Sequence, residues 1–232
     1  MSDWDAAAER SDFEYTVDCR PDYSFLTVKM PPGKPLTVES SAMATMSNNL
    51  DMSTSAGGGF SRLLTGESLF INRFEAIGSE GEIGISPPAP GDLDHIYLDN
   101  ETVFLQNSAF VAAGPDVELD SQWNGAKGFF SGTGLFLIRC SGTGDLWFNS
   151  YGAITHIDVE RDYVVDTGFI VAFTSGLDYN VSTLGGFKSL FFSGEGLICR
   201  FSGQGRIWIQ TRQVPALAAW IHPYRPQKSD ND

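Results

Sequence analysis

The segment FFSGTGLFLIRCSGTGDLWF (129–148) decides the fold, because a closely similar segment, FFSGEGLICRFSGQGRIWI (191–209), recurs later in the chain. The two segments align once one residue is dropped, which places Gly142 on Gly203 and Trp147 on Trp208. A weaker third copy is LLTGESLFINRFEAIGSEGEIGI (63–85). The copies lie about 60 to 66 residues apart, and repetition at this scale is typical of an architecture made of repeated units.

The stretches between these copies are also related. GDLDHIYLDNETVFLQNSAFVAA (91–113) resembles GAITHIDVERDYVVDTGFIVAF (152–173), with His95 on His156, and the first equivalent is PLTVESSAMATM (35–46). The chain is therefore predicted to contain one β domain of three repeats between two terminal segments. The predicted boundaries are an acidic N-terminal arm at 1–27, a domain at 28–212 with repeats at 28–90, 91–152 and 153–212, and a C-terminal tail at 213–232.

Within a unit, apolar residues alternate or come in short runs separated by Ser-Gly-x-Gly. This pattern is typical of antiparallel strands and tight turns. Helical periodicity is evident only in ALAAWIHPY (216–224), which predicts one or two helical turns. We predict an all-β fold of triplicated antiparallel units that pack as a pseudo-threefold barrel or prism, followed by a short C-terminal helix.

Composition excludes several classes of protein. The 232 residues include 29 Asp and Glu against 15 Lys and Arg, and the formal net charge of -14 argues against a surface that binds nucleic acid. No apolar run approaches the roughly 20 residues that span a bilayer, and MSDWDAAAER lacks the order of a signal peptide. We expect a soluble, cytoplasmic protein with no integral membrane segment.

The order of GGGFSRLLTGESLF, SPPAPGD, KGFFSGTGLFLIRCSGTG and GGFKSLFFSGEGLICRFSGQGRIWIQTR along the chain resembles the altered-inheritance-of-mitochondria protein 24 family, over about residues 25 to 226. The chain is similar to the prokaryotic members of that family, for which no reaction, substrate or catalytic residue is established. The resemblance implies a fold like that of the tryptophan-RNA-binding attenuation protein superfamily, which is double-stranded β-helix-like, and a tendency to form homo-oligomers. It gives no functional position to transfer, because fold does not imply function.

Motifs for known chemistry are weak. The three cysteines (Cys19, Cys140 and Cys199) form no CxxC pair, so we expect neither a disulfide framework nor a zinc site. His95 and His156 share a repeat position, which favours a shared structural hydrogen bond over metal ligation. The Gly-x-Gly segments are interpreted as turns rather than nucleotide sites, because strands follow them. No nucleophile, acid and base set can be assembled, so the sequence predicts no enzyme, no cofactor and no metal.

The candidate site consists of a repeated arginine. Arg73, Arg139 and Arg200 hold equivalent positions, each within an apolar strand. Because an unpaired buried charge is costly, each must point to solvent or find a partner, for example Glu67 or Glu195. We favour that structural interpretation. The functional alternative is that the three arginines converge and bind an anion.

Two hypotheses for function follow. The first is a non-enzymatic, homo-oligomeric β-scaffold or interaction protein, with a trimer favoured and a protein partner of unknown identity. The alternative is a binding module for a small anionic or polar ligand that uses the arginines. The apolar tail favours the first hypothesis, because Leu217, Trp220, Ile221 and Tyr224 need a surface to cover them.

Overall fold

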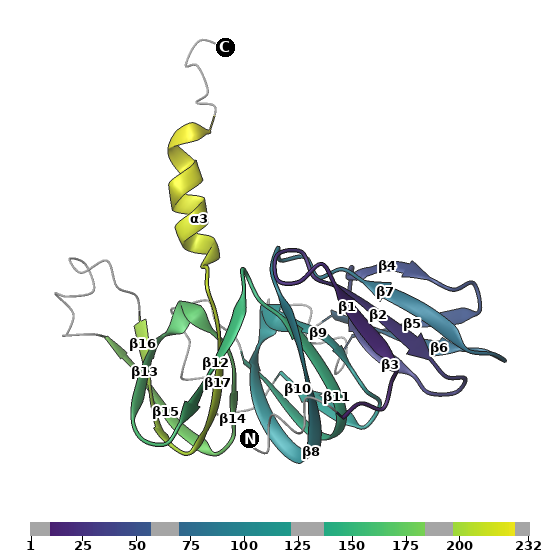
Figure 1. The fold of residues 1–232 in the computed structure, drawn as a ribbon, viewed down its shortest axis with the longest axis horizontal. Helices are drawn as coiled ribbons and strands as arrows, with labels where there is room; N and C mark the ends of the chain where they lie inside the picture. The colour runs from purple at the N-terminus through teal and green to yellow at the C-terminus, as the bar shows by residue number, and fades with distance from the viewer. Residues whose placement is uncertain (1–9, 57–69, 122–136, 184–196, 226–232) are drawn as a thin grey trace, which may run out of the picture.

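The computed structural model describes residues 10–56, 70–121, 137–183 and 197–225. Apart from one short helix and single turns of 3-10 helix, its regular structure consists of β-strands, which confirms the predicted all-β class. Figure 1 shows the strands as three bundles side by side, in chain order from right to left. The Gly-x-Gly motifs of Gly57–Gly59 and Gly132–Gly134 lie outside the described residues.

Each bundle takes its strands from one continuous part of the described chain. The first bundle contains β1 (Tyr15–Asp18), β2 (Phe25–Met30), β3 (Leu36–Glu39), β4 (Met43–Met46), β5 (Leu50–Ala56), β6 (Phe70–Ala76) and β7 (Gly81–Ile85). The middle bundle contains β8 (Leu93–Gln106), η2 (Asn107–Ala109), β9 (Phe110–Ala113), β10 (Val117–Asp120) and β11 (Leu137–Asn149). The third bundle contains β12 (Ile154–Val159), β13 (Tyr163–Asp166), η3 (Thr167–Phe169), β14 (Ile170–Thr174), β15 (Leu177–Thr183), β16 (Leu197–Gly203) and β17 (Gly205–Gln210).

Three open sheets run through these bundles, and their strand orders are β1-β2-β7-β4, β12-β17-β14-β8-β11-β9-β3-β6-β5 and β13-β16-β15, with β10 added beside β11. The predicted barrel is wrong, because these described strands leave free edges and do not close. A threefold arrangement and a double-stranded β-helix-like arrangement stay predictions.

The bundles are connected by strand pairing at two places, here called joints. At the first joint β3 pairs with β9, with Val38 opposite Ala112. At the second joint β14 pairs with β8, with Ala172 opposite Leu105. Because each joint continues a sheet from one bundle into the next, the bundles form a row (Figure 1).

The core follows from the alternation of the sequence. In β2, FLTVKM alternates half-buried and buried residues, so Leu26, Val28 and Met30 face inward. Apolar side chains collect in three clusters, in chain order, each with members from neighbouring bundles. Trp147 belongs to the first cluster and Trp208 to the second, so both tryptophans fill space where neighbouring bundles meet, as expected for large apolar rings.

Ser141–Gly144 is not the turn that its glycines predict, because β11 continues through it. The pairing of β11 with β8 shifts register between Gly142 and Thr143, which is a β-bulge. Gly142 has a φ of +121°, and a Cβ there would lie 2.3 Å from the carbonyl oxygen of Asp116. Only glycine fits this backbone. In the third bundle the corresponding strand is interrupted at Gln204, which separates β16 from β17.

Both terminal segments are informative. Within the acidic N-terminal arm, residues 10–18 are packed on the β domain, since β1 pairs with β2 and Phe13 is buried. The predicted C-terminal helix is confirmed as α3 (Val214–Ile221) followed by η4 (His222–Tyr224). In the described part of the chain, no helix is long and apolar enough to cross a membrane.

Candidate functional site

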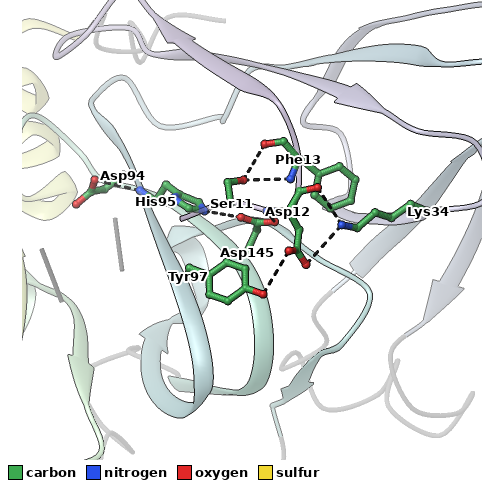
Figure 2. Close-up of polar contacts among 8 residues, drawn as sticks. All are labelled: Ser11, Asp12, Phe13, Lys34, Asp94, His95, Tyr97 and Asp145. Carbon is green, nitrogen blue, oxygen red and sulfur yellow. Dashed lines mark hydrogen bonds and ion pairs between the residues drawn. The ribbon is translucent and has the colours of Figure 1, made fainter. Parts of the chain in front are cut away.

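A buried histidine–carboxylate pair lies between β8 and β11 in the middle bundle. His95 Nε2 is 2.8 Å from Asp145 Oδ1, and the two side chains are 4% and 0% exposed. Trp147 lies directly opposite His95 in the strand register, with 5.0 Å between the ring centroids. Asp145 also accepts a hydrogen bond of 3.0 Å from the backbone N–H of Asp12. The carboxylate therefore connects the sheet to the N-terminal segment (Figure 2).

The N-terminal segment covers this pair. The Tyr15 ring lies 4.9 Å from His95 and 5.5 Å from Trp147, and the Phe13 ring contacts Trp147 edge-on at 6.2 Å. Lys34 Nζ lies 4.5 Å from the Phe13 ring centroid and 3.4 Å from Asp12. These contacts exclude water from the His95 and Asp145 side chains, so the electrostatic attraction between them is weakly screened.

A second ionic contact fixes the same segment further along. Arg20 donates two hydrogen bonds to Asp92, at 2.7 Å and 3.1 Å, and the Ser24 hydroxyl donates a third, at 3.2 Å. Such a bidentate pair is more specific in geometry than a lysine contact. Residues 10–24 are thus attached to the start and the middle of β8.

Burial changes the acid–base properties of groups around the pair. Burial raises the pKa of Asp94, against the lowering effect of its hydrogen bond from the backbone N–H of His95. Burial also raises the pKa of the Tyr15 phenol, and the negative charges of Asp145 and Asp94 add to that shift. Both shifts follow from removing a charged form from water.

The chemistry open to the pair is limited by its enclosure. His95 Nε2–H can donate to Asp145, which leaves Nδ1 as the free nitrogen, and Nδ1 is buried without a hydrogen-bond partner among the described residues. A general base must lie within hydrogen-bond reach of the proton that it removes from a substrate. Because His95 and Trp147 are both covered, the arrangement functions in this structure as a buried tie between the sheet and the N-terminal segment.

The corresponding place in the third bundle is different. His156 lies opposite Trp208 as His95 lies opposite Trp147, but Arg206 stands where Asp145 stands. Arg206 donates two hydrogen bonds to Asp158, at 2.6 Å and 3.1 Å. The expectation that the two histidines share one structural hydrogen bond is therefore wrong, because His95 contacts Asp145 whereas His156 is exposed on the surface. No group of three His, Cys, Asp or Glu residues in the described ranges could hold a metal ion.

The predicted arginines lie on three separate strands. Arg73 on β6 and Arg200 on β16 are exposed, and Arg139 on β11 is half-buried. Two strands, β9 and β3, lie between β11 and β6, while β16 belongs to the three-stranded sheet. The structure does not bring Arg73 and Arg139 onto neighbouring strands, and Glu67 and Glu195 lie outside the described residues. Anion binding by these arginines stays a prediction.

Sequence reasoning missed Asp145 and the covering N-terminal segment. A signal for Asp145 was present, since the alignment of the second and third copies sets Asp145 against Arg206 two residues before each tryptophan. A reversal of charge beside a repeated tryptophan indicates that the two copies use that position differently. No comparable signal marked Phe13, which is one apolar residue within an acidic segment.

These observations define an all-β protein of three joined bundles with a polar tie buried in the middle one. A family model described as "Mitochondrial biogenesis AIM24" matches residues 15–212, and the chain belongs to this family. An uncharacterized protein from Streptococcus pyogenes serotype M6 is 26% identical over 230 residues, covering 93% of this chain and 92% of that protein.

A solved structure shows the same fold. The crystal structure of a protein from Streptococcus pyogenes superposes with a TM-score of 0.77 at 24% identity, covering 92% of this chain and all of that one. The family expected from the sequence motifs is confirmed by the match of the family model. Likeness to the tryptophan-RNA-binding attenuation protein superfamily stays a prediction.

Proposed function

We propose that this protein is a non-enzymatic β-scaffold or interaction protein that works as a homo-oligomer. The observation that carries this proposal is the exposure of α3 and η4, none of whose residues is buried. Trp220 is 67% exposed and Tyr224 is 77% exposed. In Figure 1 the helix points away from the sheets rather than lying on them.

An apolar helix of this kind needs a cover. VPALAAWI contains no charged residue, and isolated helices of eight residues are marginal in water. Since the described part of the body does not cover α3, another surface must provide the stabilising contact. A homo-oligomer provides one without a further component, because every copy brings both the helix and its receiving surface.

The buried tie supports the non-enzymatic part of the proposal. The acid–base groups that lie close together, His95 and Asp145, are covered by the N-terminal segment and engaged with each other. They stabilise the scaffold and present no reactive atom to solvent. A trimer remains our expected subunit number.

The test is the molar mass in solution of the full chain and of a variant truncated after Arg212. Size exclusion with light scattering should give a multiple of 25.3 kDa for the full chain and a lower average mass for the truncated one. Because α3 has no buried contact with its own body, the melting temperature of dilute protein should be the same for both. A full chain that stays at 25.3 kDa at every micromolar concentration would refute the proposal.

A further inference from the structure

The two joints between bundles use the same strand register. At the first joint, Thr37 lies opposite Ala113, and at the second joint, Phe104 lies opposite Phe173. Thr37 and Phe104 are the residues that face the repeated arginines, Arg73 and Arg139, on the neighbouring strand of their own bundle. On the other side of the first joint, Ala113 faces Leu146 in β11. On the other side of the second joint, Phe173 faces Ile207 in β17.

Each end bundle also has a strand at the position that forms a joint elsewhere. Among the described residues, no strand of another bundle pairs with it. In the third bundle it is β13, an edge strand in which Val164 faces Arg200, the third repeated arginine. In the first bundle it is β4, an edge strand in which Met46 faces Ile83. The pairing of β4 with β7 also has the register shift seen where β9 meets β11 and β14 meets β17.

Residues at the two free edges are exposed, whereas the corresponding residues at the second joint are buried. At the second joint Phe104 and Phe173 are 8% and 0% exposed, whereas Val164 and Met46 are 42% and 44% exposed. Tyr163, beside Val164, is also exposed. Neither YVVD nor MATM contains the lysine, arginine or proline that natural proteins commonly place on an edge strand to prevent pairing.

We propose that β13 of one copy pairs antiparallel with β4 of a second copy, in the register of the two internal joints. Val164 then lies opposite Met46, and Val165 lies opposite Thr45. The two edges lie at opposite ends of the row of bundles in Figure 1, so the pairing is between molecules, head to tail. This proposal rests on the proposed function only in requiring a homo-oligomer, and it assigns the interface.

A second copy fits this edge better than an unrelated strand does. The two edges are the two halves of a joint that the chain already forms twice within itself, with matching pairs at equivalent positions. Backbone hydrogen bonds along the edges provide affinity, and Tyr163, Val164 and Met46 provide apolar area at the contact. A peptide strand from another protein is the alternative occupant, and the test below separates it.

The test is a cysteine cross-link in a Cys19→Ser background, since the other two cysteines are buried. Directly opposite residues have Cβ atoms about 4.5 to 5.5 Å apart, close enough for a disulfide after small adjustment. Val164→Cys with Met46→Cys should give, after mild oxidation, covalent multiples of 25.3 kDa on a non-reducing gel. The matched control is Val164→Cys with Thr45→Cys, whose side chains leave opposite faces of the sheet and should not be linked.

A variant without added cysteines provides a second readout. Val164→Lys should reduce the molar mass of the full chain, while Thr155→Lys, at an exposed position of the edge strand β12, should not. An oligomer that forms no link and keeps its mass in Val164→Lys would overturn this interface while the proposed function stands. A protein that is monomeric throughout would overturn both, and would leave β13 to a strand of another protein.

Discussion

Asp145 connects the middle bundle to the N-terminal segment. It has no exposed surface, and it accepts hydrogen bonds from His95 and from the backbone of Asp12. Removing one member of a buried hydrogen-bonded pair leaves its partner unsatisfied, which costs more than the hydrogen bond itself contributes.

We therefore expect Asp145→Ala to lower the free energy of unfolding by about 2 to 3 kcal/mol, the usual cost of leaving a buried polar group without its hydrogen-bond partner. Urea unfolding followed by circular dichroism measures the change. Asp99→Ala is the control, because Asp99 forms an ion pair with Arg10 on the surface, where the two side chains are 68% and 53% exposed, respectively. Such surface pairs contribute roughly 0 to 1 kcal/mol. Equal losses of unfolding free energy in the two variants would show that the His95–Asp145 pair contributes no more stability than a surface pair.

Glu39 at the end of β3 predicts a dependence of stability on pH. Burial raises its pKa from the ordinary value of 4.5 to about 7, and its Oε2 is buried with no hydrogen-bond partner among the described residues. Well below pH 4.5 the carboxyl is neutral in both the folded and unfolded states. As pH rises toward 7 the unfolded state releases its proton first, so the folded state loses stability.

Glu39→Gln keeps the neutral form at every pH and should avoid that loss. At pH 8 it should be more stable than the parent protein by about 1 to 2 kcal/mol, a value reduced because the side chain is partly exposed. At pH 4 the two proteins should melt at the same temperature. Thermal melts across this range decide the matter, and a variant that is less stable at pH 8 would contradict the interpretation of Glu39 as an uncompensated buried acid.

At the scale of single elements, local patterns predicted that the chain is built of β-strands and ends in a short helix. ALAAWIHPY (216–224) predicted a helical segment that the structure has as α3 and η4, because the helix is local and needs no distant contact. The Ser141–Gly144 segment predicted a turn and is a bulge instead. Positive-φ glycines are required in both cases, so the residue types alone do not distinguish a chain reversal from a bulge.

Contacts between distant elements could not be predicted in the same way. The partner of His95 is 50 residues away, and the cover provided by Phe13 is more distant still from Trp147. The repeat alignment predicted that the three arginines occupy equivalent positions, but not which residues they face. In the structure Arg73 and Arg139 face Thr37 and Phe104, through which bundles join, while Arg200 faces Val164 on the edge strand β13. These roles become visible only from the strand pairing.

At the scale of the whole molecule, a head-to-tail interface has a property that a symmetric one lacks. Each copy contributes two different edges, so a copy defective in one edge keeps the other. Met46→Glu should prevent pairing at the β4 edge and leave the β13 edge intact. Val164→Glu should prevent pairing at the β13 edge and leave the β4 edge intact. The parent protein for this test is the chain truncated after Arg212, so that α3 contributes no contact. Each variant alone should then be monomeric, because the β13–β4 contact would place a charge against an apolar side chain at its centre.

An equal mixture of the two variants should form one intact joint and then stop. The β13 edge of the Met46→Glu copy meets the β4 edge of the Val164→Glu copy, and no further pairing is possible. Light scattering should therefore give a mixture of monomers and a species of twice the monomer mass, with none larger. The control is the double variant, which has neither edge and should stay monomeric when mixed with either single variant at low concentration. If the mixture of single variants stays at the monomer mass while the parent protein assembles, the interface is symmetric or lies elsewhere, because only a two-edged contact can be restored by mixing.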